Sequence, residues 1–225
     1  MLRPRRVVGI MAKAPLAGQA KTRLIPVLGA DRAAGLQQQM LLDTIDLTSA
    51  ALQGHGAISI VCPTAADRVV LQSLVPADVA VIAHERGELM RGLDYGLSYH
   101  LEQGYEQVVL LDGDSPTLPA DYVRSAFDQL SGDAVVLGPT LDGGYYLIGA
   151  CRPRPALFDW EHLDSAKVCW QTHQLAEAMG ARVTLLPPWY DVDTAEDLER
   201  LVDELRSYPS RAPHTCRFLE RDGRQ

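Results

Sequence analysis

The 225-residue sequence has few cysteines, and they lie far apart. The four are Cys62, Cys151, Cys169 and Cys216, and no two of them form a C-x-x-C pair. They are too few and too scattered for a zinc ribbon or for the disulfide framework of a small secreted protein. A chain of this length buries roughly 70% of its unfolded surface and needs no covalent cross-link. We therefore expect reduced thiols in a cytoplasmic protein.

Long apolar runs and an excess of positive charge are also missing. No segment approaches the roughly 18 apolar residues of a membrane helix. The arginine-rich start, Met1–Ala14, contains an apolar run shorter than that of a signal peptide, so a buried first strand is the better interpretation. A net charge of −8 argues against a general nucleic-acid binder. It leaves room for a phosphate ligand at a local basic patch.

The rest of the composition, with 47% apolar and 22% charged residues, is close to the globular average. It excludes a disordered chain, a collagen and a coiled coil. Strand and helix patterns alternate along the chain and predict an α/β fold, with a mainly parallel sheet covered by helices on both faces. The expected strands are Arg6–Met11, Ala57–Cys62, Val79–Ile82, Gln107–Leu111, Ala134–Leu137, Tyr145–Ala150 and Arg182–Leu186. The expected helices are Asp31–Leu52, Ala65–Leu74, Gly87–Glu102, Leu118–Leu130, Ser165–Met179 and Thr194–Arg206.

Two further expectations concern the C-terminal part of the chain. Trp170 stands among Val168, Leu175 and Ala178 in a predicted helix, so we expect it in the core. Residues 1–206 are predicted to form a single domain, and residues 207–225, which contain proline and arginine, a loosely attached tail.

Ligands of such folds bind beyond the carboxyl ends of the strands, and a basic loop follows the first strand. This loop, Met11–Leu24, reads MAKAPLAGQAKTRL and contains Gly18, Lys13, Lys21, Thr22 and Arg23. Backbone N–H groups and cations of this kind can bind a polyphosphate. The spacing is not that of a P-loop, because only Gly18 precedes Lys21 and Thr22. A solvated basic loop is the alternative.

Paired aspartates occur in two other loops. Asp112 and Asp114 follow the strand Gln107–Leu111, and Asp191 and Asp193 precede the last helix. Carboxylates at i and i+2 of an extended chain point to the same side, where Mg²⁺ or Mn²⁺ could join them to a phosphate. The alternatives are an Asp-rich turn for the first pair and, for Asp193, support of a helix cap at Thr194.

A fourth segment, Leu137–Gly149, contains a glycine pair. Asp142, Gly143 and Gly144 are typical of a hairpin turn. The same glycines, followed by Tyr145, would also let the backbone approach a ligand closely.

Together these segments resemble the nucleotide-diphospho-sugar transferase superfamily, which has the GT-A fold. The resemblance runs from Val7 to about Leu205. MAKAPLAGQAKTRL, GDSPTL, LGPTLDGGYYLIG and DVDTAEDL are close to motifs of the bacterial rSAM/selenodomain-associated transferase 1 family, to which glycosyl transfer is often ascribed. The first loop is also similar to the start of the 2-phospholactate guanylyltransferases. Asp114 and Asp193 match the two metal ligands of sugar-phosphate nucleotidyltransferases, and Thr22-Arg23 resembles the end of their G-T-R motif.

The resemblance implies a three-layer α/β/α fold and a metal-dependent nucleotidyltransferase. Such an enzyme would move a nucleotidyl group from an NTP to a small phosphorylated or carboxylated acceptor and release pyrophosphate. Mg²⁺ or Mn²⁺ would be bound by Asp114 and Asp193 with help from Asp112, and Lys21, Arg23 and Asp114 would be catalytic. The implied nucleotide-binding residues are Ala12, Lys13, Gly18, Lys21, Thr22, Arg23 and Asp112, and the implied acceptor-binding residues are Asp142, Gly143, Gly144 and Tyr145.

Departures from the pattern leave alternatives open. The segment Gly87-Glu88-Leu89-Met90 stands where the superfamily has Gly-Asp-Leu-Gly, so the base is not indicated. A glycosyltransferase could use an NDP-sugar on the same aspartates. LLDGDSPT is superficially similar to the D-x-D-x-T motif of haloacid-dehalogenase phosphatases, but that motif normally follows the first strand. A nucleotide-sensing module without turnover is the fourth possibility. The acceptor and the oligomeric state stay open.

Overall fold

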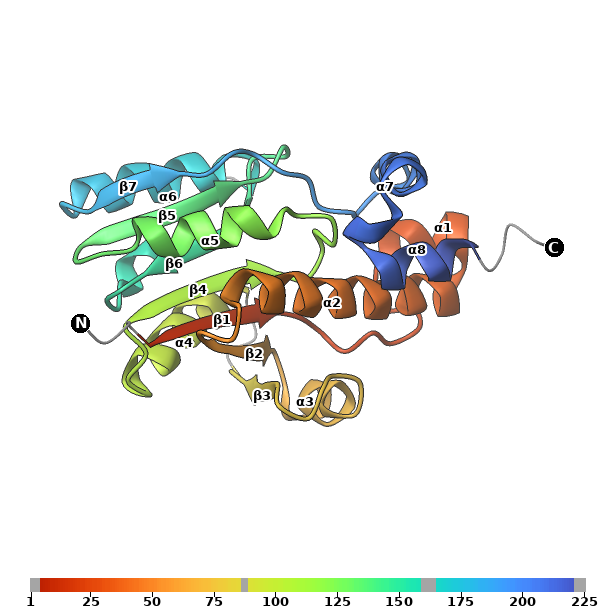
Figure 1. The fold of residues 1–225 in the computed structure, drawn as a ribbon, viewed down its shortest axis with the longest axis horizontal. Coiled ribbons are helices and arrows are strands. Elements are labelled where there is room, and N and C mark those ends of the chain that lie inside the picture. Colours follow the sequence, from red (N-terminus) through yellow and green to blue (C-terminus); the bar gives the residue numbers. More distant parts are fainter. Residues whose placement is uncertain (1–4, 86–88, 159–164, 221–225) are drawn as a thin grey trace.

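The computed structural model of the chain describes residues 5–85, 89–158 and 165–220, and in these residues a seven-stranded sheet forms the centre (Figure 1). The strand order is β3-β2-β1-β4-β6-β5-β7. The strands are β1 (Arg6–Met11), β2 (Ala57–Cys62), β3 (Ala80–Ala83), β4 (Gln107–Asp112), β5 (Ala134–Pro139), β6 (Tyr145–Ala150) and β7 (Arg182–Leu185). Neighbouring strands pair in parallel in the described residues, except that β6 runs antiparallel to both β4 and β5. The predicted mixed, mainly parallel sheet is confirmed.

Helices cover both faces of this sheet. They are α1 (Ile25–Leu28), α2 (Ala30–Leu52), α3 (Ala65–Gln72), α4 (Leu89–Glu102), α5 (Ala120–Gln129), α6 (Val168–Ala178), α7 (Ala195–Ser207) and α8 (Pro213–Glu220), with short 3-10 turns η1 (Thr22–Leu24), η2 (Pro155–Phe158), η3 (Ser165–Lys167) and η4 (Pro209–Arg211). Val8 and Ile10 of β1 pack with α2 and α5, whereas Val7 packs with α4 on the opposite face. This alternation follows from the two-residue period of a strand, and it makes the three layers seen in Figure 1.

The predicted element limits hold to within a few residues in the described parts. The helix predicted over Ala65–Leu74 ends at Gln72, and the one predicted from Leu118 begins at Ala120. The helix predicted from Ser165 starts as the turn η3 and becomes α-helical at Val168. The first residues of the predicted helix Gly87–Glu102 lie outside the described residues.

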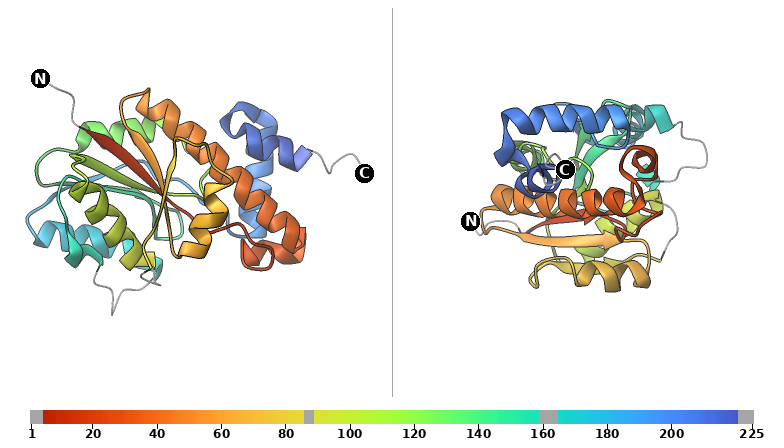
Figure 2. Two further views of the ribbon diagram at one scale, coloured as in Figure 1. Left: turned by 90° about the horizontal axis from the view of Figure 1, so that it is seen from below. Right: turned by 90° about the vertical axis from the view of Figure 1, so that its right-hand side faces the viewer.

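A third core cluster lies beyond the carboxyl ends of the strands. It joins Leu24, the first half of α2, and the inner faces of α7 and α8. Figure 2 shows the two C-terminal helices beside α2 from two sides. The carboxylate of Asp43 on α2 accepts the backbone N–H groups of His214 and Thr215 at 2.9 and 2.8 Å, at the start of α8. The expectation of a loose tail after Ser207 is therefore wrong for residues 208–220.

The prediction that Trp170 lies in the core is also wrong. This residue lies on α6 with 61% of its surface exposed. The inner face of α6 is instead formed by Cys169, Thr172 and Ala176. A helix of this length can bury one stripe only, and the stripe here is one residue out of phase with the expected one.

The cysteines form no disulfide, and all four are free. Burial raises the pKa of the Cys62 and Cys169 thiols to about 11, so both are protonated at neutral pH. Within the described residues, no helix has both the length and the apolar character needed to cross a membrane.

Candidate functional site

Three loops meet at the carboxyl edge of the sheet, and they are the loops singled out from the sequence. The first follows β1 and the second follows β4, and these neighbouring strands pair Met11 with Asp112. The third connects β7 to α7. It is joined to the second by a hydrogen bond from the Val192 N–H to the carbonyl oxygen of Asp114 at 3.0 Å. Residues distant in the sequence are thereby brought to one place.

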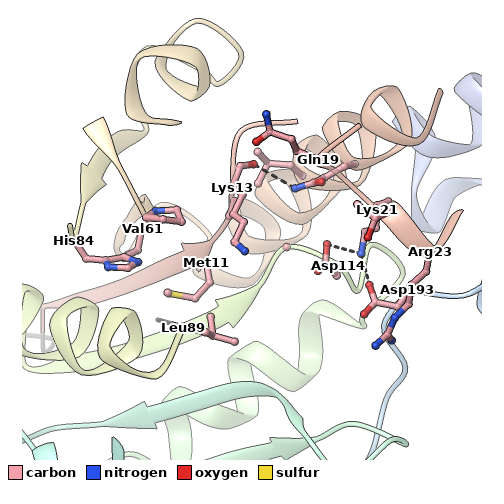
Figure 3. A pocket seen from close by; sticks show the side chains of 16 residues that line it. Met11, Lys13, Gln19, Lys21, Arg23, Val61, His84, Leu89, Asp114 and Asp193 are labelled. Atoms are coloured by element: carbon pink, nitrogen blue, oxygen red, sulfur yellow. Dashed lines mark hydrogen bonds and ion pairs between the residues drawn. The ribbon is translucent and has the colours of Figure 1, made fainter. Parts of the chain in front are cut away.

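Lys21 occupies the centre of this meeting point. Its backbone is left-handed, with φ 46°, where the first loop turns into η1. The ammonium Nζ lies 2.9 Å from Oδ1 of Asp114 and 2.8 Å from Oδ1 of Asp193 (Figure 3). Only 4% of the lysine side chain is exposed, against 38% and 42% of the two aspartate side chains. Burial by itself would lower the pKa of Lys21, but the attraction of both carboxylates outweighs it and holds the pKa above its usual value. The ammonium is therefore charged.

Asp112 is oriented differently from Asp114 although the two are only two residues apart. Its carboxylate accepts the Asp114 N–H at 3.3 Å and the Ser115 hydroxyl at 3.1 Å, so it closes the turn after β4. Burial, followed by repulsion from Asp114 and Asp191, raises the pKa of Asp112 well above its usual range. Asp112 thus supports the loop that presents Asp114.

Asp191 adds a further carboxyl group to this edge. Burial raises its pKa to about 6, and the charges of Asp142, Asp193 and Asp114 act in the same direction. The hairpin turn that carries Asp142 is therefore close enough to the third loop for Asp142 to repel Asp191. Repulsion among these neighbouring carboxyl groups favours the binding of a cation between them.

A cavity of about 350 Å³ opens beside the Lys21–aspartate cluster. One part of its wall is basic and polar, with Lys13, Lys21, Arg23 and Gln19, and another part is apolar, with Met11, Val61, Leu89 and the ring of His84. Figure 3 shows the Lys13 side chain directed into the space between these two parts. An apolar surface with a few convergent polar groups is the common form of a small-molecule site.

Most of the residues predicted to contact a nucleotide or a metal line this cavity. They are Ala12, Lys13, Lys21, Thr22, Arg23, Asp114 and Asp193. Asp112 and Gly18 are not among the lining residues. Gly18 has φ 79° and is exposed, and a Cβ there would meet nothing within 4 Å, so the position needs the backbone freedom of glycine rather than its small size.

The predicted acceptor segment lies outside the cavity wall. The Gly144 N–H donates to Oδ1 of Asp142 at 3.1 Å, which fixes the hairpin turn between β5 and β6. A Cβ added at Gly143 would stand 1.9 Å from the carbonyl oxygen of Ala166. The hydroxyl of Tyr145 is buried against α6, and burial raises its pKa above the usual value. The structure brings Asp142 towards the aspartates and leaves the next three residues packed in the fold.

Some cavity residues were not predicted from the sequence. His84 directly follows β3 at the carboxyl edge of the sheet, and its position after a strand was an available indication. Its N–H donates to the Cys62 carbonyl oxygen at 2.9 Å, and its ring lies against Gly92, where a Cβ would be 2.7 Å from Nε2. Gln37 on α2 reaches the first loop and donates to the Lys13 carbonyl oxygen at 3.2 Å. No local pattern in the helix indicates this contact.

Another group of potential metal ligands lies away from the cavity. Asp43, Asp46 and His214 offer atoms within 4.8 Å of one another. The two oxygens of Asp43 already accept N–H groups at the start of α8, and the His214 ring contacts Asp46 at 3.1 Å. This group therefore holds α8 against α2.

Comparison with solved structures defines the class of protein. A candidate nucleotide-diphospho-sugar transferase from Desulfovibrio desulfuricans G20 is 28% identical, with a TM-score of 0.87, and the match covers 98% of this chain and 96% of that one. A nucleotidyl transferase from Methanothermobacter thermautotroptrophicus has 17% identity and a TM-score of 0.59 over 89% of this chain and 98% of that one. A CMP:2-keto-3-deoxy-manno-octonic acid synthetase complexed with CTP has 12% identity and a TM-score of 0.54 over 91% and 99% of the two chains. The predicted superfamily and the assignment to the transferases are confirmed.

The family is narrower than the superfamily. Residues 44–162, more than half of the chain, match the family described as "Uncharacterized protein conserved in bacteria (DUF2064)", and the chain belongs to it. The matched region includes Asp114 and the Asp142 turn, whereas Lys21 and Asp193 lie outside it. No curated protein matches the chain.

Proposed function

We propose that the protein is a metal-dependent nucleotidyltransferase. It would move a nucleotidyl group from an NTP to a small phosphorylated or carboxylated acceptor and release pyrophosphate. The observation that carries the proposal is the convergence of Asp114 and Asp193 on one cation at the rim of the cavity. Two carboxylates from different loops are placed at hydrogen-bond distance from a single point, and other cations stand nearby.

The donor set fits Mg²⁺ or Mn²⁺. Both ions prefer carboxylate oxygens and are commonly bound by one or two carboxylates together with substrate phosphates. Asp114 and Asp193 would hold the ion, and Asp112 would keep Asp114 in place through its hydrogen bond to the Asp114 N–H. When bound, the ion would neutralise charge on the phosphate that reacts. A solved relative of similar fold from Mycobacterium tuberculosis H37Rv, at 19% identity and a TM-score of 0.51, is described as a complex with manganese.

The chain's own residues would position the nucleotide and neutralise its charge. Lys13 and Arg23 would bind the phosphates that leave as pyrophosphate, since both line the cavity and both are exposed to a ligand. The apolar wall at Met11, Val61 and Leu89 would exclude water from the nucleoside. The acceptor would approach from the side of Asp142, whose charge acts on Asp191. Phosphoryl chemistry of this type requires positioning and charge neutralisation and no covalent enzyme intermediate.

Glycosyl transfer from an NDP-sugar is the second candidate. The 28% identity to a candidate nucleotide-diphospho-sugar transferase, over nearly the full length of both chains, favours it. The same aspartates would then face a diphosphate. The number of cations at the cavity favours the nucleotidyl reading, because a triphosphate carries more charge to neutralise than a sugar diphosphate.

A thermal-shift matrix would separate the two candidates. The protein is heated with each of the four NTPs and with a set of NDP-sugars, each with and without Mg²⁺, and pyrophosphate release is then measured for any NTP that binds. A ligand that binds only the folded state raises the midpoint by mass action. We expect a Mg²⁺-dependent shift with an NTP. A shift confined to NDP-sugars would replace nucleotidyl by glycosyl transfer, and no shift with any ligand would contradict both.

Matched variants would test whether the nucleotide and the metal bind in the cavity. Asp114→Asn should abolish the Mg²⁺-dependent part of the shift, whereas Asp203→Asn, on the exposed face of α7, should leave it unchanged. Arg23→Ala should weaken triphosphate binding more than diphosphate binding, with Arg206→Ala as the control for loss of a surface arginine. Equal weakening of triphosphate and diphosphate by Arg23→Ala would count against nucleotidyl transfer.

A further inference from the structure

The position between Asp114 and Asp193 is filled by the chain itself. The Lys21 ammonium contacts one oxygen of each carboxylate, at 2.9 and 2.8 Å, and its side chain is almost completely buried there. Mg²⁺ coordinates oxygens at about 2.0–2.1 Å. An ion bound by the same two oxygens would lie within roughly 5 Å of Nζ. The ammonium and the ion would therefore repel each other and compete for the same two carboxylate oxygens.

We propose that Lys21 keeps the metal position closed until a polyphosphate ligand arrives. The proposal rests on the proposed function, in which Asp114 and Asp193 bind the metal. In the ligand-free protein the ammonium neutralises the carboxylates and competes with divalent cations. A polyphosphate offers the ammonium a new anionic partner and supplies the metal with further oxygen ligands. Metal and polyphosphate therefore bind together, and either one alone binds weakly.

The exchange of partners by Lys21 requires movement of its side chain but not of the loop backbone. The residue sits at the turn into η1, and both Lys13 and Arg23 line the same cavity wall. Lys21 itself lines the cavity, so in this proposal a rotation of its flexible four-carbon stem carries Nζ from the carboxylates towards the cavity. The neighbouring core residue Leu24 is fully buried and anchors the following turn. The loop backbone can stay in place while the side chain moves.

The surrounding charges determine what happens when the ammonium is removed. Asp114 and Asp193 come from different loops, and each lies within 2.9 Å of the same ammonium. Without Lys21, these two carboxylates lose the cation that lies between them. A divalent ion is then the best available replacement. Removing the lysine charge should therefore increase the affinity of the free protein for a divalent cation.

Mn²⁺ binding to the nucleotide-free protein tests this directly. Free Mn²⁺ is measured by electron paramagnetic resonance during titration of the wild type, Lys21→Gln and Lys13→Gln. The two variants lose the same charge at the same cavity, but only Lys21 contacts the aspartates. We expect Lys21→Gln to bind one Mn²⁺ at least tenfold more tightly than the wild type. Lys13→Gln, which loses a charge that does not contact the aspartates, should gain much less affinity than Lys21→Gln. Lys21→Met serves as a second variant if the glutamine protein does not fold.

Other results would overturn the proposal. If the wild type binds Mn²⁺ as tightly as Lys21→Gln, the lysine does not close the site. If Lys13→Gln gains as much affinity as Lys21→Gln, net charge rather than position is responsible. The gain must also disappear in the double variant Lys21→Gln/Asp114→Asn. Failure of the proposed function looks different. In that case neither protein binds Mn²⁺ in the titration, and equilibrium dialysis of a labelled NTP shows no Mn²⁺-dependent binding to either protein.

Discussion

The contacts of Lys21 predict a non-additive pattern of stability losses. At 2.9 Å, two unit charges attract each other by about 6 kcal/mol at an effective dielectric constant of 20 and by about 1.4 kcal/mol in bulk water. The aspartate side chains are 38% and 42% exposed, which places each contact near the lower value. Relief of the repulsion between each aspartate and Asp191 offsets a further part. We expect Asp114→Asn and Asp193→Asn each to cost about 1 kcal/mol of unfolding free energy, since Lys21 keeps one partner.

The double variant should behave differently. With both carboxylates replaced, an ammonium that is 4% exposed has lost both of its ion-pair partners. Leaving a buried charge uncompensated costs about 3–5 kcal/mol. The loss should therefore exceed the sum of the two single losses by at least 1 kcal/mol.

Urea unfolding of the metal-free protein, with a chelator present, measures all three values at constant m. Asp203→Asn removes a partner of Arg206 on the surface of α7, where both side chains are more than 70% exposed, and it should change stability by less than about 0.5 kcal/mol. If the single losses are negligible and the double variant equals their sum, Lys21 is not held between the two aspartates in the free protein.

Three further predictions concern pH and backbone conformation. The pKa of Asp191 is raised to about 6, so this residue lowers stability progressively as pH rises from about 4 to 6, and the whole loss is present at pH 7. Asp191→Asn should therefore raise stability at pH 7 by on the order of 1 kcal/mol and have little effect below about pH 4. A pH-independent gain in urea unfolding would refute this. Gly143→Ala, whose Cβ would meet the Ala166 carbonyl at φ 100°, should cost more than about 3 kcal/mol in denaturant unfolding. Gly132→Ala, at φ 57° with open space around it, should cost only about 1–2 kcal/mol, and similar losses for both would exclude the clash as the cause. Burial lowers the pKa of His100, so stability should fall as pH drops below 6.5; in His100→Gln this loss should be smaller, and an unchanged pH profile of unfolding would refute it.

The strands were predictable because each is a short apolar run that ends at a polar or turn-forming residue. Asp114 and Asp193 could be found for the same reason, since they stand where such runs end at the carboxyl edge of the sheet. Asp112 shows the limit of this reasoning. The rule that residues i and i+2 point to one side requires an extended chain, but the chain bends at Gly113 directly after β4. Asp112 consequently closes the turn instead of lining the cavity.

The partner of Lys21 could not be predicted from the sequence. Asp193 is 172 residues away, and local patterns carry no information about such contacts. The first loop was expected to present Lys21 to phosphates, and nothing in its composition indicates that the ammonium first binds the chain's own carboxylates. Trp170 and the C-terminal segment were misjudged for a related reason. The side of a short helix that is buried depends on the elements that pack against it, and local sequence does not identify these elements.

The attachment of α8 to Asp43 has a consequence for proteolysis and truncation at the C-terminal end of the chain. Asp43 lies on α2, the helix that also supplies Gln37 and Leu41 to the cavity wall. A protease that removes residues after Ser207 would strip two N–H donors from a carboxylate that is 1% exposed. Loss of α8 would thus leave a buried carboxylate without these partners on the same helix that carries two residues of the cavity wall. An affinity tag is therefore safer when it extends the chain past residue 220 than when it replaces α8.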